Sequence, residues 1–159
     1  MKGHPENVVG RPSDRRSPRQ WLLAATLAAV IAPAMAGEQA PARPTEVFIG
    51  RVAALINEYR SQHRLDRLTS AAVLEQVADV HSRDMAQARR PSHGGFRERF
   101  RQVDGAICVE NVAAHFDTPE ALFEGWRRSP AHERNLLEPR IVRMGLAARD
   151  RYVTFFACG

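Results

Sequence analysis

The sequence predicts an α+β domain in which helices pack on an antiparallel sheet. Of the 159 residues, 44% are hydrophobic and 26% are charged, which is the balance of a globular protein. After residue 44, apolar residues first recur at three- and four-residue spacing, and the short β-branched segments come mostly later in the chain. A chain in which the helices come first and most strands come last is typical of an α+β domain.

Apolar periodicity and capping residues predict the helices. The first helix starts at Thr45. The second helix starts at Ser70, which is its predicted N-cap, and ends at Arg89-Arg90-Pro91. Their apolar faces are Phe48, Val52, Leu55, Ile56 and Tyr59, then Leu74, Val77, Ala78, His81 and Met85. A glycine-rich loop, 92–95, and a short helix over 97–101 follow. Thr118-Pro119-Glu120 begins another helix, and Ser129-Pro130 begins a short one that runs through Leu137.

Three short apolar segments predict strands. Residues 107–114 form a strand or extended segment that contains Glu110 and Asn111. Residues 141–148 and 152–157 form a hairpin around the turn 149–151.

The N-terminal 36 residues have the pattern of a bacterial secretory signal peptide. Arg15, Arg16 and Arg19 precede an 11-residue apolar run, 21–31, and Ala34-Met35-Ala36 is a small-x-small cleavage site. The run is shorter than the 20 or so residues that a permanent membrane helix needs. We therefore expect a signal peptide over 1–36, a flexible leader over 37–44, and one domain over 45–159 without a membrane span. An uncleaved anchor or a buried core helix is the alternative, and the arginine pair leaves both general and twin-arginine export open.

The distribution of charge argues against a nucleic-acid partner. The net charge is +5, but residues 1–36 hold five basic and two acidic residues, against 18 basic and 16 acidic in the remainder. The mature protein is expected in the periplasm or outside the cell. Cys108 and Cys158 are then expected to form a disulfide rather than a reactive or metal-binding pair, because secreted compartments are oxidising and short-spaced partners are absent from the sequence.

Several motifs together resemble bacterial members of the CAP family of cysteine-rich secretory and pathogenesis-related proteins. The specific ones are Glu110-Asn111-Val112-Ala113 and Trp126-Arg127-Arg128-Ser129-Pro130-Ala131-His132. Supporting ones are Asn57-Glu58-Tyr59-Arg60, His81-Ser82, Asp84-Met85-Ala86, Ser92-His93-Gly94, Asn135-Leu136-Leu137 and Gly145. The resemblance runs from about Glu46 to the C-terminus and implies a three-layer α-β-α sandwich with a cleft.

The resemblance also implies a site of two histidines and two acids that binds a divalent metal, often zinc. His93 matches the first histidine, Glu110 the first acid and His132 the second histidine. The position of the second acid holds Ser129, and Glu124 lies five residues before it, which turns it away from that helix face. Asn111 is expected to fix the loop beside Glu110, and His81 to be part of the core.

Two functional hypotheses and one purely structural hypothesis fit these residues. The first is a binding module for a ligand, lipid or envelope component, since most members of the family lack an established catalytic activity. The alternative is a metal-assisted hydrolase or peptidase in which Glu110 is the base and His93 and His132 hold the metal. In the structural hypothesis, the same groups only hold the glycine-rich loop against the helix through hydrogen bonds. We favour binding over catalysis.

Overall fold

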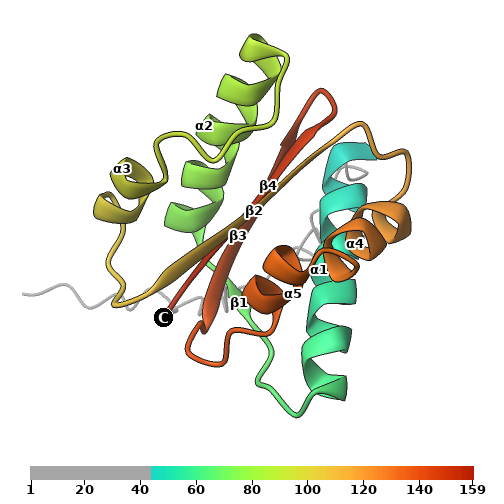
Figure 1. The fold of residues 1–159 in the computed structure, drawn as a ribbon, viewed down its shortest axis with the longest axis vertical. Helices are drawn as coiled ribbons and strands as arrows, with labels where there is room; N and C mark the ends of the chain where they lie inside the picture. Colours follow the sequence, from blue (N-terminus) through green and yellow to red (C-terminus); the bar gives the residue numbers. More distant parts are fainter. Residues whose placement is uncertain (1–43) are drawn as a thin grey trace, which may run out of the picture. The chain divides into compact units, whose positions relative to one another are not determined.

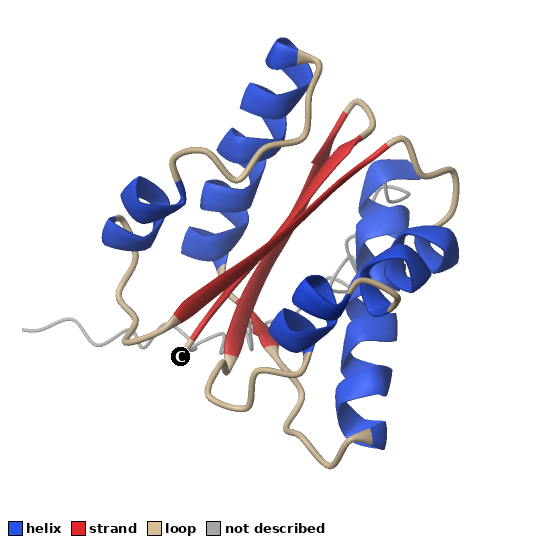
Figure 2. Cartoon of the chain, in the orientation of Figure 1, coloured by secondary structure: helices blue, strands red, loops and turns tan. Residues whose placement is uncertain are grey.

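The computed structural model of the protein describes residues 44–159 (Figures 1 and 2). The predicted signal peptide, 1–36, and nearly all of the predicted leader lie outside these residues. The helices are α1 (Pro44–Gln62), α2 (Ala72–Ala88), α3 (Phe96–Arg101), α4 (Pro119–Arg127) and α5 (Pro130–Leu136). The strands are β1 (Thr69–Ser70), β2 (Cys108–Ala114), β3 (Arg143–Arg149) and β4 (Tyr152–Cys158). None of the described helices is long and apolar enough to cross a bilayer.

The four strands form one sheet in the order β1-β3-β4-β2. The strands β3 and β4 form the predicted hairpin, and β4 also pairs antiparallel with β2. The two-residue strand β1 was not predicted, and it pairs parallel with β3, so the sheet is mixed. The pair is too short to leave a periodic pattern in the sequence. Ser70 belongs to this strand, and the N-cap of α2 is Ala71, so the prediction that Ser70 caps this helix was wrong.

Helices cover both faces of the sheet, which confirms the α+β sandwich (Figure 1). The helices α2 and α3 lie on one face, and α1, α4 and α5 lie on the other. Since successive side chains of a strand point to opposite faces, Phe155 and Phe156 of β4 enter different cores. Phe155 packs with Val52, Ile56, Leu122, Trp126 and Leu136, and Phe156 packs with Leu74, Val77, Ala78, Cys108 and Cys158. Every residue of β4 is buried, as expected for a central strand.

A disulfide joins the ends of two neighbouring strands. Cys108 and Cys158 are directly opposite each other in β2 and β4, and they form the predicted bond across 50 residues of sequence. The C-terminal strand, and with it the centre of the sheet, is thereby tied to the edge strand β2.

Two buried polar side chains hold the connection between α1 and the sheet. Asn57 donates to the carbonyl of Leu68 and accepts from its backbone N–H, at 3.0 and 2.7 Å. Arg60 is fully buried, and its guanidinium donates to the carbonyls of Asp66, Leu136, Glu138 and Ile141. These bonds satisfy backbone oxygens that the loops after α1 and α5 would otherwise leave unpaired. The N-terminus of α4 is capped as predicted, by the hydroxyl of Thr118 accepting from Ala121.

Candidate functional site

The candidate site lies at β2, the edge strand of the sheet. Glu110 is opposite Phe156 in the register and Asn111 is opposite Phe155, so these adjacent side chains point to opposite faces. Glu110 faces α2 and α3, and Asn111 faces α4 and α5. The outer edge of β2 is covered by side chains, because Asn135 donates to the carbonyl of Glu110 and Trp126 Nε1 donates to that of Val112. The edge strand is therefore protected from pairing with another strand at these positions.

The carboxylate of Glu110 is buried and paired with an arginine. Its side chain is 1% exposed. Arg99 Nε donates to Oε2 at 2.7 Å and Arg99 Nη2 donates to Oε1 at 2.9 Å, which is the two-bond fork geometry that arginine forms with a carboxylate. The third nitrogen, Arg99 Nη1, donates to the carbonyl of Gly94 at 2.8 Å. A residue of α3 and the glycine-rich loop thus hold this acid in place.

Two histidines flank the Glu110 carboxylate. His93 Nδ1 lies 3.0 Å from Glu110 Oε1, and the side chain of His93 is 53% exposed. His81 Nε2 lies 3.8 Å from the same oxygen and 2.7 Å from the carbonyl oxygen of Ser92. Carboxylate and carbonyl oxygens accept hydrogen bonds, so His93 Nδ1 and His81 Nε2 are the protonated nitrogens of these rings. Burial lowers the pKa of His81, which keeps its imidazole neutral at pH 7.

His132 enters the site from the other layer. Its ring centroid lies 6.1 Å from that of His93. Asn111 donates to the carbonyl of His132 at 3.0 Å and accepts from Asn135 at 2.9 Å, so Asn111 fixes the start of α5 against β2. Burial, and secondarily the neighbouring His93, lower the pKa of His132. The structure therefore brings His93, Glu110 and His132 to one edge of the sheet, with Asn111 behind them.

Glu124 and Ser129 are not part of this arrangement. Both carboxylate oxygens of Glu124 accept from arginines on its own helix or its C-cap, Arg127 and Arg128, at 2.6 to 2.8 Å. These bonds lower the pKa of Glu124 to about 2. Ser129 is the N-cap residue of α5, and within residues 44–159 its side chain has no hydrogen-bond partner.

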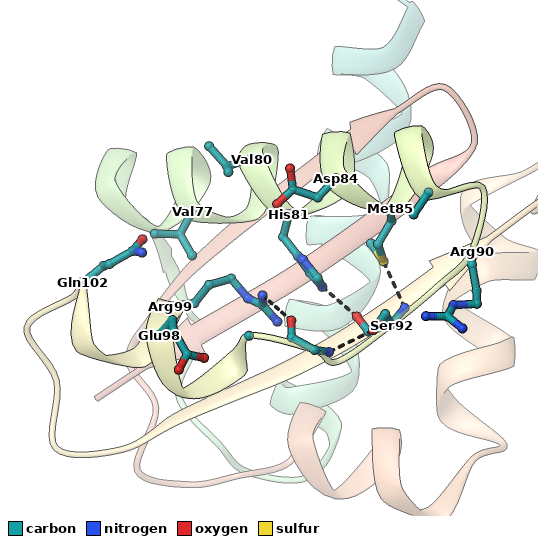
Figure 3. Close-up of a pocket in the computed structure, with 13 residues that line it drawn as sticks. Val77, Val80, His81, Asp84, Met85, Arg90, Ser92, Glu98, Arg99 and Gln102 are labelled. Atoms are coloured by element: carbon teal, nitrogen blue, oxygen red, sulfur yellow. Dashed lines mark hydrogen bonds between the residues drawn. The ribbon is translucent and has the colours of Figure 1, made fainter.

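Two hollows are lined by one or the other member of the Arg99–Glu110 pair. The first, the α2–α3 cavity, has a volume of about 390 Å³ and lies between α2 and the segment 90–102, with Arg99, His81 and Met85 in its wall (Figure 3). The second, the β2-edge pocket, has a volume of about 370 Å³ and is lined by His93, Phe96, Cys108, Val109, Glu110 and Asn135. The arginine lines the first space and the glutamate lines the second.

The arrangement of these groups does not fit a divalent metal. Across residues 44–159, no three histidine, cysteine, aspartate or glutamate side chains are grouped so that they could hold an ion. Arg99 donates to both oxygens of Glu110, and the nitrogens of His93 and His81 nearest that carboxylate carry hydrogens, so a metal bound directly beside Glu110 would have to displace these donors. The zinc site stays a prediction.

Arg99 is the site residue that the sequence reasoning missed. The short helix α3 holds three arginines, and Arg99 is the buried one. Its position gives a signal: Arg99 lies three residues after Phe96, which places the two on the same side of α3, and the rings of Phe96 and Phe100 pack into the core around Leu74 and Phe156. His81 was interpreted as a core residue, and it is buried, but it also borders the Glu110 carboxylate.

Comparison with known families identifies the domain. The model of the cysteine-rich secretory protein family, CAP, matches residues 53–158. The chain belongs to the CAP family. Within residues 53–158 lie the β2 edge, the disulfide and the histidines of the site.

Relatives of this CAP domain come from several bacteria. The uncharacterized membrane protein YlbC of Bacillus subtilis is 30% identical over 107 residues, which are 63% of this chain and 31% of YlbC. A crystal structure of an extracellular SCP-domain protein from Bacillus anthracis has 27% identity and a TM-score of 0.66, over 75% of this chain and 44% of the other. The chain thus spans less than half of each of these two relatives.

One further structure shows the same fold at lower identity. An outer surface protein of Borrelia burgdorferi has 20% identity and a TM-score of 0.65, over 73% of this chain and 96% of the other. At this identity the likeness concerns the fold alone.

Proposed function

We propose that this CAP domain is an exported binding module whose β2-edge pocket receives an envelope or extracellular component. The observation that carries the proposal is the state of Glu110. A general base must reach the proton that it removes. The Glu110 side chain is 1% exposed, and both of its oxygens accept hydrogen bonds from Arg99. This arrangement supports binding over hydrolysis with Glu110 as the base.

The lining of the β2-edge pocket is suited to ligand recognition. It combines the half-exposed imidazole of His93, the ring of Phe96, the aliphatic Val109 and the amide of Asn135. Ligand pockets are typically apolar and aromatic with a few fixed polar groups that orient the bound molecule. Here the polar groups are fixed by the bonds of Glu110 and Asn111 behind them. The pocket therefore offers a preorganised surface rather than a reactive one.

Export rests on the N-terminal pattern and on the relatives. The Bacillus anthracis relative is described as extracellular. We expect cleavage after Ala36, so that the exported protein begins at Gly37. N-terminal sequencing of protein recovered from the periplasm or the medium tests this. Recovery of the intact chain from the membrane fraction would instead favour an uncleaved anchor.

Co-sedimentation with envelope fractions tests the binding function. The purified protein is incubated with peptidoglycan sacculi or with vesicles of phosphatidylglycerol and phosphatidylethanolamine, and the bound fraction is measured against concentration. We expect saturable binding to one of them. His93→Ala is expected to weaken it about tenfold or more, the effect of losing a central contact. His63→Ala is the matched control, because His63 is also exposed but lies at the end of α1.

Two other outcomes identify the competing functions. If neither fraction binds, and the folded protein cleaves a peptide library in a way that Glu110→Gln abolishes, the protein is a hydrolase. If His132→Ala lowers the melting temperature but leaves envelope binding intact, the site has a structural role, which is to hold the glycine-rich loop against α5.

A further inference from the structure

We propose that Arg99 is the resident cation of the CAP site: its guanidinium holds the place beside Glu110 that a divalent metal would need, and so closes the site to metal ions. This inference goes beyond the proposed function and does not depend on it. It concerns only the groups around one buried carboxylate.

The charge of the buried Glu110 carboxylate is balanced by Arg99. A buried carboxylate needs a compensating positive charge, since burial of an unpaired charge is strongly unfavourable. Arg99 supplies that charge at 2.7 and 2.9 Å and is itself only 9% exposed. Arginine does not lose its proton in proteins, so this cation is permanent across the physiological pH range. A metal ion entering beside Glu110 would meet the guanidinium as a like charge.

Arg99 is anchored on both sides of its guanidinium. Its Nη1 donates to the carbonyl of Gly94, and the residues beside it in α3, Phe96 and Phe100, pack into the core with Phe156. Displacing the guanidinium would break three hydrogen bonds at once. The arginine is therefore held toward Glu110 and is not a mobile surface side chain that a metal could push aside.

The two histidines beside Glu110 are held as hydrogen-bond donors. The nitrogens of His93 and His81 that lie nearest Glu110 Oε1 donate to oxygens, at 3.0 and 2.7 Å. Each of these nitrogens would have to lose its hydrogen, and its hydrogen bond, to bind a metal. Glu110 Oε1 thus accepts from both Arg99 and His93, and a metal at that oxygen would have to displace both donors.

Zinc titration calorimetry of the full chain tests the proposal, with wild type, Arg99→Met and Arg97→Met compared. Arg97 is the control because it lies in the same helix and is exposed. We expect no zinc binding at this site in the wild type or in Arg97→Met. In Arg99→Met we expect zinc to bind at least about tenfold more tightly than in the wild type. The double variant Arg99→Met, His93→Ala is expected to lose this gain.

A second variant keeps the test decisive if Arg99→Met does not fold. Arg99→Gln removes the charge but retains a hydrogen-bond donor toward Glu110, and it is expected to gain zinc binding in the same way. In each folded variant, zinc is expected to raise the melting temperature, while neither zinc nor EDTA shifts that of the wild type. Micromolar zinc binding by the wild type that His93→Ala abolishes would overturn the proposal. A folded Arg99→Gln protein that takes no zinc would also overturn it. Neither result bears on envelope binding, which the sedimentation assay measures separately.

Discussion

A close approach between a helix and the sheet predicts a large effect for one added methyl group. Gly145 lies in β3, directly beneath the start of α2. A Cβ atom on Gly145 would lie 2.0 Å from the carbonyl carbon of Leu74, 2.2 Å from its oxygen and 2.3 Å from the backbone nitrogen of Glu75. All three are backbone atoms of a helix, so no side-chain rotation relieves the contact. Gly145→Ala must push α2 away from the sheet.

The size of the effect follows from these distances. Carbon atoms in contact are separated by about 3.5 to 4.0 Å, so the helix must retreat by roughly 1.5 Å or more. The retreat opens a gap between Leu74, Val77 and Ala78 of α2 and Phe156 of β4, which form one core. Overpacking of a core costs about 1 to 3 kcal/mol, and the rigid neighbours place this case at the upper end. We expect Gly145→Ala to lower the free energy of unfolding by about 3 kcal/mol, and the melting temperature by about 10 °C.

Urea denaturation followed by circular dichroism measures this change. Gly50→Ala is the matched control, because Gly50 lies within α1 and a Cβ there would have nothing within 4 Å. That substitution is expected to stabilise the protein, by up to about 1 kcal/mol, since alanine is the better helix former. A free energy of unfolding of Gly145→Ala within about 0.5 kcal/mol of the wild-type value would show that α2 can accommodate the added methyl group without loss of packing.

Three further predictions concern the disulfide, the buried arginine of α1 and the histidines. Replacing Cys108 and Cys158 by alanine is expected to lower the free energy of unfolding by about 4 kcal/mol, the loop-entropy value for a 50-residue separation, and an unchanged urea midpoint would contradict it. Arg60→Leu leaves buried carbonyls without their donor and is expected to cost at least about 2 kcal/mol in the same assay; a melting temperature equal to that of the wild type would show that water replaces the guanidinium. Folding lowers the pKa of His132 and His81 from the ordinary value of 6.5. Below that pH the unfolded chain therefore binds more protons than the folded protein, so the free energy of unfolding is expected to fall as the pH drops from 7 toward 5. His132→Gln should reduce this slope, and an unaltered slope would exclude His132 as a source.

The sequence predicted most elements because their signals are local. Thr118 and Pro119 mark the start of α4, and the apolar spacing from Phe48 to Tyr59 marks α1. The strand β1 and the correct cap of α2 escaped prediction for one reason. Ser70 has the side chain of a helix cap, but its backbone pairs with Met144, 74 residues away. A pairing between distant segments leaves no periodic pattern at either of them.

The family motifs pointed to four residues that meet at β2, but also to Glu124 and Ser129, which lie apart from them, and to none of the connections. The motifs gave His93, Glu110, Asn111 and His132, and the structure brings these together at β2. They did not give Arg99, because an arginine in a helix is usually a solvated charge, and only the packing of α3 against Phe156 buries it.

The sequence by itself determined the identity of most elements and the family pattern, since each depends on residues close in the chain. Tertiary structure decided the partner of Glu110. Whether a buried carboxylate faces a metal, a base or an arginine depends on which element packs over it, and here α3 places a guanidinium there. The desolvation of that carboxylate makes the choice of cation decisive, because a charge removed from water must be paired where it lies.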